Sequence, residues 1–579
     1  MLKDENNQWY CFVVLIIFSL FLVRIINLEC DLPGYGMTFY QPIDEGLYSR
    51  AAINYCHYGN FFSTGKYELS LSSTFKSNAF NIMLQILSFK VFGNTYYGLR
   101  MPSVIIAGII FVLIYITIRK IFAQSLKPLQ NRMLTILFMV YVLFDFSFLI
   151  LSRVVENSNM RALSGILAVF IYSKTQEKEK LRYFLLGMLS VISIFLIYFS
   201  NVFILLALGM LVLTYVFRKQ WDMLKAVIHY GGVGVLTGLI LSEIYYRIIW
   251  NTGALQSFFD GVFSFSERTS TSLGQTVFLI RWIKNCLIFW DSNMFFYGML
   301  LLFITLLALI VNLYTAIKKR KDFDLFVCFL IIAMVVQAVF FHDWMERKSI
   351  TIYPVLIGNA ALFFTNLEQF QEILKRKYAK HVSILFVVFY IFLLYTMIRF
   401  RINYSYFPDF DSKALYVVVC GAVVQIIIIF ILLFVYLLNK TTLKIVRILS
   451  CLCFLIGIAV NGYFDFEYAF SYDLFTEKQA MVEIGKTIGN NYVLGPYAYG
   501  FTLYNEIQPV SQDLDVCGEY IKSSDMKYVI DYTHGAFYAD QILSNGGKTG
   551  VLIDSYERSI SIYGRQDYEI GVFRKDSEE

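Results

Sequence analysis

Long apolar runs recur along about the first 460 residues of this 579-residue chain, and they constrain its fold more than any other feature. A helix of about 20 apolar residues can cross the hydrocarbon core of a bilayer. About thirteen runs are predicted to do so: 12–28, 102–118, 133–151, 159–173, 183–199, 202–217, 226–249, 294–316, 325–341, 349–365, 382–398, 414–438 and 445–461. With 58% hydrophobic and 16% charged residues, the chain is too apolar for a soluble protein. We predict a polytopic α-helical membrane protein.

One stretch decides the orientation of the later helices. Tyr183 to Phe217 is apolar throughout except at Ser200 and Asn201. We predict two short helices joined by a tight turn at these two polar residues. A single long helix is the alternative, and it would invert the orientation of every span that follows.

Basic residues indicate which loops are cytoplasmic, because loops rich in Lys and Arg stay on that side. They gather in every second loop, at 119–132, 174–182, 218–225, 318–321, 375–380 and 440–447. The intervening loops, predicted to lie outside, are 29–101, 152–158, 250–293, 342–348 and 399–413. We therefore expect a multi-pass protein of the cell membrane with a cytoplasmic N-terminus and an extracytoplasmic C-terminal tail. The net charge of +6 follows from this topology and indicates no nucleic-acid partner.

Two regions are too polar to span and too long to be simple turns. Within the first outer loop, 29–101, the runs 45–55 and 80–92 are predicted to be helices lying at the membrane interface. In the tail we predict a helix at 482–488 and strands at 492–494 and 527–531. The chain should thus divide into a transmembrane domain, 1–461, and a small extracytoplasmic α/β domain, 462–579.

Cysteine and histidine give no metal signature. The nine cysteines show no zinc spacing, and the five histidines are dispersed. Cys30, Cys56 and Cys517 are predicted to lie outside, and a disulfide between Cys30 and Cys56 is an open alternative.

An adjacent acidic pair, Asp44 and Glu45, follows the first span by about fifteen residues. Charge is costly in hydrocarbon, so carboxylates near the point where a helix leaves the bilayer either are solvated or serve a function. A plain structural alternative is that they cap an interfacial helix, whose N-terminus favours acids. Arg153 and Glu156 form a second charged group, and their spacing also fits a simple ion pair.

These residues carry a resemblance to a known family. The matching pieces are Asp44, Glu45, Gly46 and Tyr48, then Gly93, then Gly98, Leu99, Arg100, Met101, Pro102 and Ser103, and finally Ser152, Arg153 and Glu156. Over residues 10–365 the chain resembles the GT-C membrane glycosyltransferases, in particular protein O-mannosyltransferases and lipid A aminoarabinose transferases. Where the latter carry Lys-Pro-Pro-Leu, the chain keeps the lysine as Lys76 but has Ser77, Asn78 and Ala79 in place of the other three residues.

The resemblance implies transfer of a sugar from a polyprenyl-phosphate-linked donor, on the outer face, to a protein, lipid or envelope-glycan acceptor. A carboxylate must take the proton of the attacking acceptor, and we expect Asp44 to be this base, Glu45 to orient it or the acceptor, and Glu156 to line the same cavity. Direct displacement would invert the anomeric centre. The leaving phosphate needs a cation or a metal; the candidate cations are Lys76, Arg153, Arg347 and Lys348. The sequence leaves the sugar, the acceptor and a divalent-metal requirement open.

Two other classes of function compete with this interpretation. A transporter or channel would place unpaired acids near the middle of the membrane, and Asp145 and Glu243 are the acids within predicted spans. A membrane sensor would use the tail to bind a ligand outside. Neither accounts as well for the long amphipathic first loop.

Overall fold

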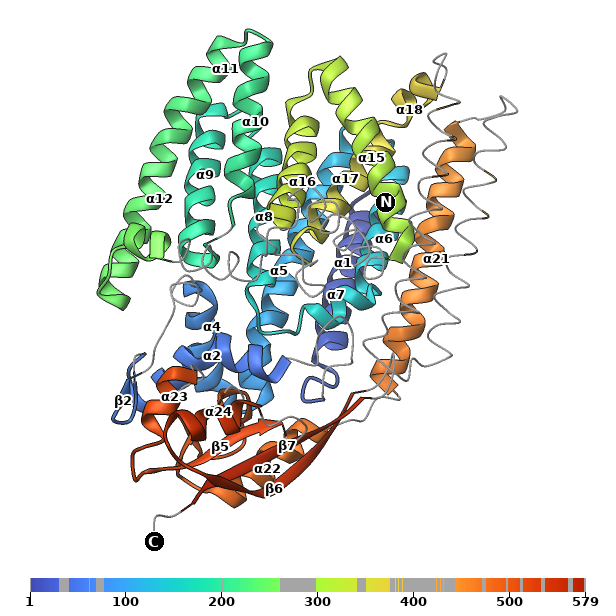
Figure 1. Cartoon of the computed structure of the whole chain (residues 1–579). Helices are drawn as coiled ribbons and strands as arrows, with labels where there is room; N and C mark the ends of the chain where they lie inside the picture. The colour runs from blue at the N-terminus through green and yellow to red at the C-terminus, as the bar shows by residue number, and fades with distance from the viewer. Residues whose placement is uncertain are drawn as a thin grey trace.

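The structure is a computed structural model of the chain (Figure 1). It describes residues 2–30, 41–61, 63–68, 78–199, 201–260, 298–340, 350–374, 443–470, 475–495, 498–510, 514–532, 537–560 and 566–576, with isolated helical residues between 381 and 431. Lys76, Arg347 and Lys348 lie outside the described residues, as do nearly all of the predicted spans 382–398 and 414–438.

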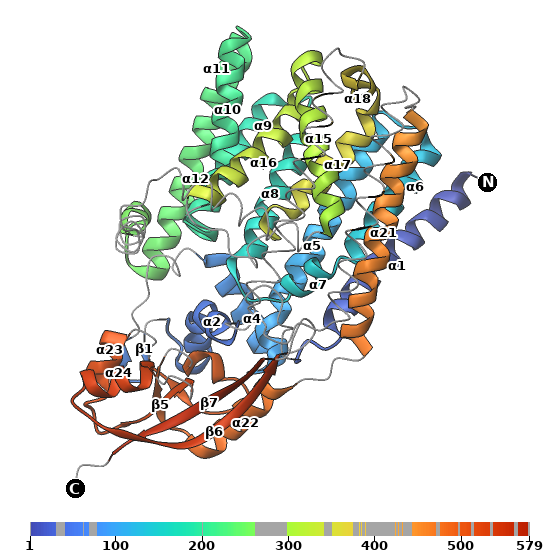
Figure 2. The ribbon, with the colours of Figure 1, turned by 45° about the vertical axis from the view of Figure 1, so that its right-hand side comes forward.

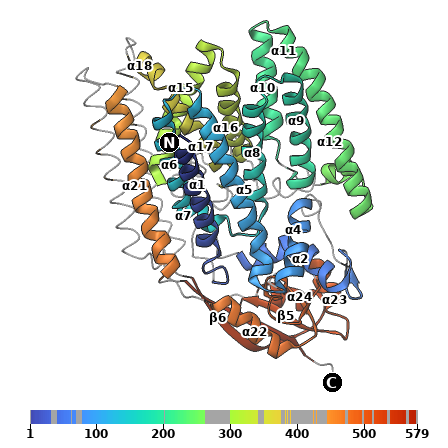
Figure 3. The ribbon, with the colours of Figure 1, turned by 180° about the vertical axis from the view of Figure 1, so that it is seen from behind.

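The molecule has three levels, which the views of Figures 1, 2 and 3 show consistently. A bundle of long helices forms one end, and a β-sheet built from the C-terminal segment forms the other. Helices α2 (Gln41–Tyr58) and α4 (Ala79–Phe92) lie between them. These two helices match the interfacial helices predicted at 45–55 and 80–92.

The helices of the bundle are α1 (Leu2–Ile25), α5 (Tyr96–Ala123), α6 (Pro128–Leu143), α7 (Phe146–Leu151), α8 (Asn157–Lys174), α9 (Glu179–Ile192), α10 (Phe203–Phe217), α11 (Trp221–Ala226), α12 (Gly232–Tyr245), α15 (Gly298–Lys319), α16 (Asp322–Phe340), α17 (Tyr353–Thr365), α18 (Leu367–Leu374) and α21 (Leu443–Phe470). Within the described part of the chain, four helices are long and apolar enough to cross a membrane: 96–123, 179–197, 221–250 and 444–463. They support a membrane location, while the count of thirteen spans and their orientation stay predictions.

The helical hairpin predicted between Tyr183 and Phe217 is confirmed. Helix α9 continues into a π-helical turn, η2 (Ser193–Ile197), and α10 begins at Phe203. Between them, the amide of Asn201 donates to the carbonyl of Tyr198 at 2.9 Å. The turn therefore falls where the polar residues interrupt the apolar run.

The span predicted at 133–151 is broken in the structure. Helix α6 ends at Leu143, and α7 begins after Asp145, whose carboxylate accepts a hydrogen bond from the amide of Phe148 at 2.9 Å. Aspartate is a favoured N-cap because its side chain satisfies an amide that the helix leaves without a partner. Asp145 is thus a buried helix cap. At the other end of the bundle, α21 runs past the predicted boundary at residue 461 to Phe470.

The C-terminal segment contains α22 (Thr476–Ile488), β3 (Tyr492–Leu494), the 3₁₀ turn η6 (Ala498–Phe501), β4 (Gln508–Pro509), α23 (Leu514–Tyr520), β5 (Met526–Tyr532), α24 (Phe537–Asn545), β6 (Gly550–Ile560) and β7 (Gln566–Lys575). The sheet order is β4-β3-β5-β7-β6; β3 is parallel to β4 and β5, and β7 is antiparallel to β5 and β6. The strand predicted at 492–494 has the predicted bounds. The helix begins six residues earlier than predicted.

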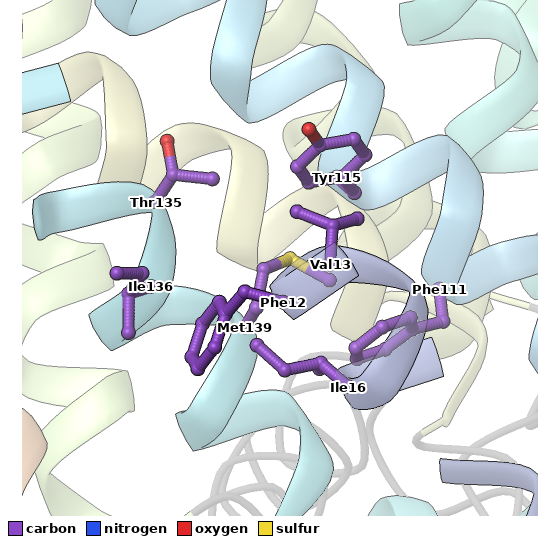
Figure 4. A pocket seen from close by; sticks show the side chains of 8 residues that line it. All are labelled: Phe12, Val13, Ile16, Phe111, Tyr115, Thr135, Ile136 and Met139. Carbon is purple, nitrogen blue, oxygen red and sulfur yellow. The ribbon is translucent and has the colours of Figure 1, made fainter. Parts of the chain in front are cut away.

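The hollows among the described helices include the following two. One, of about 10 Å³, is enclosed by eight side chains of α1, α5 and α6 (Figure 4); it holds no more than a single water. The other is an apolar groove of about 500 Å³ between α6 and α21. No predicted site residue lines either of them, so the candidate site lies elsewhere.

Candidate active site

The first turn of α2 carries the acidic pair. Pro42 stands in this turn, where its missing amide costs no helical hydrogen bond. The backbone of Asp44 lies in α2, and its side chain is outside the described atoms. Glu45 is buried, with 1% of its surface exposed. A buried carboxylate requires a partner, and α5 supplies it.

Arg100, in the first turns of α5, forms a two-pronged ion pair with Glu45. Its Nε lies 3.1 Å from Oε1 and its Nη2 lies 3.0 Å from Oε2 of the carboxylate. Its Nη1 donates to the carbonyls of Leu28 and Cys30 at 2.9 and 2.8 Å. Burial raises the pKa of Glu45, and the Arg100 guanidinium limits that rise. One guanidinium thus joins α2, α5 and the end of α1.

A second buried acid reaches the same guanidinium from the C-terminal segment. Glu477, in the first turn of α22, lies 3.8 Å from Nη2 of Arg100. Its carboxylate also accepts a hydrogen bond from the hydroxyl of Tyr96 at 2.5 Å, and Arg100 lies over the Tyr96 ring at 4.0 Å. Residues nearly 400 positions apart therefore share one buried charge cluster.

The turn between α7 and α8, which belongs to the helical bundle, contacts Glu45 of the acidic pair. The amide of Val155 donates to Oε1 of Glu45 at 3.3 Å. The turn thus brings Arg153 and Glu156, both buried, next to α2. The contact between Glu45 and this turn is made by the Val155 backbone, and a shared cavity and the catalytic roles of Glu45, Arg153 and Glu156 stay predictions.

Both charged residues of this turn have bonds of their own. Nη2 of Arg153 donates to the carbonyl of Val23 at 2.7 Å, and Oε2 of Glu156 accepts from the hydroxyl of Ser158 at 3.2 Å. Arg24 of α1 lies beside them, with its Nε 3.1 Å from the Ser152 hydroxyl. The turn is consequently held to the end of α1.

The turn η6 of the C-terminal segment packs directly on α2 at Gly46. A Cβ atom at this position would lie 2.4 Å from the amide nitrogen of Gly500 and 2.7 Å from the carbonyl carbon of Tyr499. Both are backbone atoms, which cannot rotate away as a side chain can. Only glycine allows this approach.

We expect Gly46→Ala to lower the free energy of unfolding by about 1–3 kcal/mol, because the two backbones must separate. Helix propensity alone predicts the opposite sign, since Ala is better than Gly in a helix by about 1 kcal/mol. Thermal unfolding in detergent measures the difference. Gly209→Ala in α10 is the matched control, because its Cβ meets nothing within 4 Å; a Gly46→Ala variant as stable as this control would contradict the close packing.

A hydrogen-bonded ion pair also fastens α22 to the segment after α1. Lys478 Nζ lies 2.6 Å from Glu29 Oε2, and the hydroxyl of Tyr504 donates to Glu29 Oε1 at 2.6 Å. Burial alone would raise the pKa of Glu29, but the bonds from Lys478 and Tyr504 outweigh it and lower that pKa. The Tyr504 hydroxyl also accepts a hydrogen bond from the amide of Tyr96, the first residue of α5, at 2.9 Å.

A lowered pKa makes this contact dependent on pH. Its stabilisation is present above the pKa of an unfolded glutamate, about 4.3, and is lost as the pH falls through the lower folded value. We expect Lys478→Met to cost about 1 kcal/mol or less at pH 7, and less at pH 3 than at pH 7. Unfolding curves at both pH values measure this, with Lys486→Met, which removes an exposed pair with Glu483 on the same helix, as control. An equal loss at both pH values would contradict the assignment.

The sequence did not identify two residues of the buried cluster. Arg100 belongs to the motif that carries the family resemblance, but the sequence analysis assigned it no role. A guanidinium beside an apolar run requires a partner, and this could have marked it. Glu477 carried no signal, because nothing in its neighbourhood distinguishes it from a surface glutamate. Asp465 of α21, buried near Arg24, was likewise missed.

Two open alternatives are corrected by the structure. Cys30 is buried and Cys56 is exposed, and no disulfide joins them. Glu243 is not unpaired: its carboxylate bonds to Arg247 at 2.7 Å and to the amide of Ala254 at 2.7 Å. Among the described residues, no three His, Cys, Asp or Glu side chains are grouped as metal ligands.

No protein-family model matches the chain, and no curated protein matches it in sequence. Solved structures do match. ArnT from Cupriavidus metallidurans in its apo state aligns with a TM-score of 0.52 at 11% identity, over 98% of both chains. ArnT bound to undecaprenyl phosphate aligns with a TM-score of 0.53 at 11% identity, over 97% of this chain and 98% of ArnT. The Archaeoglobus fulgidus oligosaccharyltransferase in its apo form aligns with a TM-score of 0.45 at 11% identity, over 90% of this chain and 69% of the oligosaccharyltransferase. Along almost its whole length, the chain shares the GT-C fold of ArnT.

Proposed function

We propose that the chain is an integral-membrane glycosyltransferase that moves a sugar from a polyprenyl-phosphate donor to an acceptor on the outer face. The observation that carries the proposal is the whole-length agreement in fold with ArnT, which has been solved with undecaprenyl phosphate bound. The acidic pair adds chemical support. Its helix lies between the membrane bundle and the C-terminal segment, where a lipid-linked donor and an outer acceptor can meet (Figure 2).

In the proposed reaction Asp44 is the general base. It accepts the proton of the acceptor's hydroxyl or amine as that group attacks the anomeric carbon. The bond from the anomeric carbon to the phosphate oxygen breaks, and the configuration inverts. Glu45 holds α2 in place through Arg100, which makes it a positioning residue for Asp44.

Charge develops at both ends of the breaking bond. The sugar gains oxocarbenium character, which a nearby carboxylate such as Glu156 stabilises. The departing lipid phosphate gains negative charge, which fixed cations stabilise; we propose Lys76, Arg153, Arg347 and Lys348 for this role.

The direct experiment uses the full-length protein, purified in detergent or in isolated membranes. A radiolabelled sugar on polyprenyl phosphate is supplied with envelope extracts of the host, and labelled product is separated from donor. Transfer that depends on the protein supports the proposal. The identity of sugar and acceptor follows from mass spectrometry of envelope glycans and lipid-linked sugars in a deletion strain. Unchanged glycans together with no transfer in vitro would refute the proposal and favour a transporter or sensor.

A further inference from the structure

The apolar groove between α6 and α21 opens toward the outside of the helical bundle. Met133 and Leu455 line it, and 62% and 52% of their surfaces are exposed. Its volume of about 500 Å³ lies within the range of about 300–1,000 Å³ that is typical of ligand pockets. The groove is therefore accessible to a ligand that comes from the membrane.

The packing of the two helices fixes the shape of this groove. The ring of Phe454 in α21 contacts the rings of Phe138 and Tyr141 in α6, with centroid distances of 4.5 and 5.0 Å. Gly457 lies so close to Tyr141 that a Cβ atom at this position would be 2.7 Å from the ring. These contacts hold α6 against α21, so the groove beside them is preformed.

The groove follows the helices for the depth of one membrane leaflet. On α21 it is lined by residues three or four positions apart, which form one stripe along the helix: Arg447, Cys451, Leu455 and Ile458. At 1.5 Å per residue, the distance from Arg447 to Ile458 is about 16 Å. The hydrocarbon core is about 30 Å thick, so each leaflet contributes about 15 Å. The groove thus has the length and the apolar lining that suit a single lipid chain.

One end of the groove is polar. Gln130 and Arg447 are the polar side chains among the described lining residues, and each stands near the N-terminal end of its helix. Helix α21 ends beside the sheet, so its N-terminal turns lie at the opposite end of the bundle (Figure 2). The polar end of the groove is therefore far from α2 and its acidic pair.

Basic residues accumulate at this polar end. Lys127 and Arg132 stand at the start of α6, and Lys444 precedes Arg447 at the start of α21. The stretches 119–144 and 440–464 contain no Asp or Glu. An arginine can lay its apolar stem along such a groove while its guanidinium stays at the membrane surface. Basic pockets between transmembrane helices bind anionic lipid headgroups in this way.

We propose that the groove binds an anionic phospholipid, with one acyl chain between α6 and α21 and the phosphate at Arg447. A zwitterionic lipid fits less well, because its headgroup brings a second cation to the basic end. The polyprenyl-phosphate donor also carries a phosphate, but the proposed reaction needs that phosphate beside α2, at the other end of the bundle. The occupant is thus a lipid of the bilayer, and the proposal does not depend on the reaction that the protein catalyses.

The test uses the full-length protein, stripped of lipid in detergent. Dioleoyl-phosphatidylglycerol is titrated in, native mass spectrometry counts the bound lipid, and the melting temperature is followed. One lipid should bind saturably and raise the melting temperature, because it binds the folded state and bridges two helices. Dioleoyl-phosphatidylcholine, with the same chains and no net charge, should bind about tenfold more weakly.

Two variants examine the two parts of the site separately. Arg447→Gln should raise the Kd for phosphatidylglycerol about five- to tenfold, the effect of one lost basic contact with a headgroup. Cys451→Trp keeps the charge and fills the groove, so saturable binding should be lost. The matched controls are Lys225→Gln in α11, at the same end of the bundle (Figure 1), and Leu236→Trp at an exposed position of α12. Both controls should bind phosphatidylglycerol as the wild type does.

Three outcomes overturn the inference. Equal affinity for the two phospholipids, or an unchanged Kd in Arg447→Gln, would show that the groove holds only the ordinary lipid that surrounds any membrane protein. Undiminished binding in Cys451→Trp would show that no chain lies in the groove. Undecaprenyl phosphate that displaces phosphatidylglycerol and loses affinity in Arg447→Gln would identify the carrier lipid as the occupant instead.

Discussion

Replacing Asp44 with Asn is expected to lower the rate of sugar transfer by about 10²- to 10⁴-fold, the contribution typical of a general base. Asn has nearly the same shape as Asp and cannot accept the acceptor's proton at neutral pH. Because the change is isosteric and lies in the first turn of α2, folding and membrane insertion should be retained. The measurement is transfer of labelled sugar under single-turnover conditions, with donor binding determined separately.

The neighbouring residue provides the contrast. Glu45 is bonded to Arg100 and to the amide of Val155, so Glu45→Gln should lower stability together with activity. Asp44→Asn should lower activity alone. Full activity in the Asp44→Asn variant would exclude Asp44 as the base. A loss of stability equal to that of Glu45→Gln would show that Asp44 serves the fold instead.

Removal of Arg100 is expected to give the largest loss of stability of any single substitution in the cluster. Arg100→Met should cost about 3–5 kcal/mol, the range for breaking a buried ion pair on one side. The variant leaves the carboxylates of Glu45 and Glu477 buried close together, and their repulsion raises the energy of the folded state. One of them must then take up a proton, so the loss should become smaller as the pH is lowered.

Unfolding in detergent micelles, followed at several pH values, measures this loss. Lys486→Met is the control, because its pair with Glu483 on α22 is exposed and should be worth less than about 1 kcal/mol. Combining Arg100→Met with Glu45→Gln should restore part of the stability, since the buried charge has been removed along with its partner. Additive losses in the double variant would show that the two side chains do not interact.

The local pattern of apolar, polar and turn residues made part of this fold predictable. The helical hairpin around Asn201 follows from the interruption of an apolar run by polar residues, and helices α2 and α4 follow from the helix-like run at 45–55 and the amphipathic run at 80–92. The strand at 492–494 was marked by its turn signal at Gly495. Each of these features is encoded within a window of about twenty residues.

The cluster that supports the candidate site could not be predicted in this way. The contact between Arg100 and Glu477 joins segments that are far apart in the sequence. The residues around each of them give no indication of which distant side chain it contacts. The break between α6 and α7 was missed for a different reason. Asp145 looked like an acid inside a span, although its ability to cap a helix accounts for its burial.

The close approach of Gly46 to Gly500 has a consequence for biosynthesis. Helix α2 emerges early in translation, whereas the turn that packs on it is made about 450 residues later. At typical rates of synthesis, on the order of 5–20 residues per second, the delay is roughly 20 to 90 s. During that time α2 lacks the turn η6 that packs on it at Gly46. A truncated chain, or a ribosome stalled before the tail, therefore leaves an inserted protein whose first loop is still unassembled, and quality-control proteases at the membrane meet the nascent chain in that state.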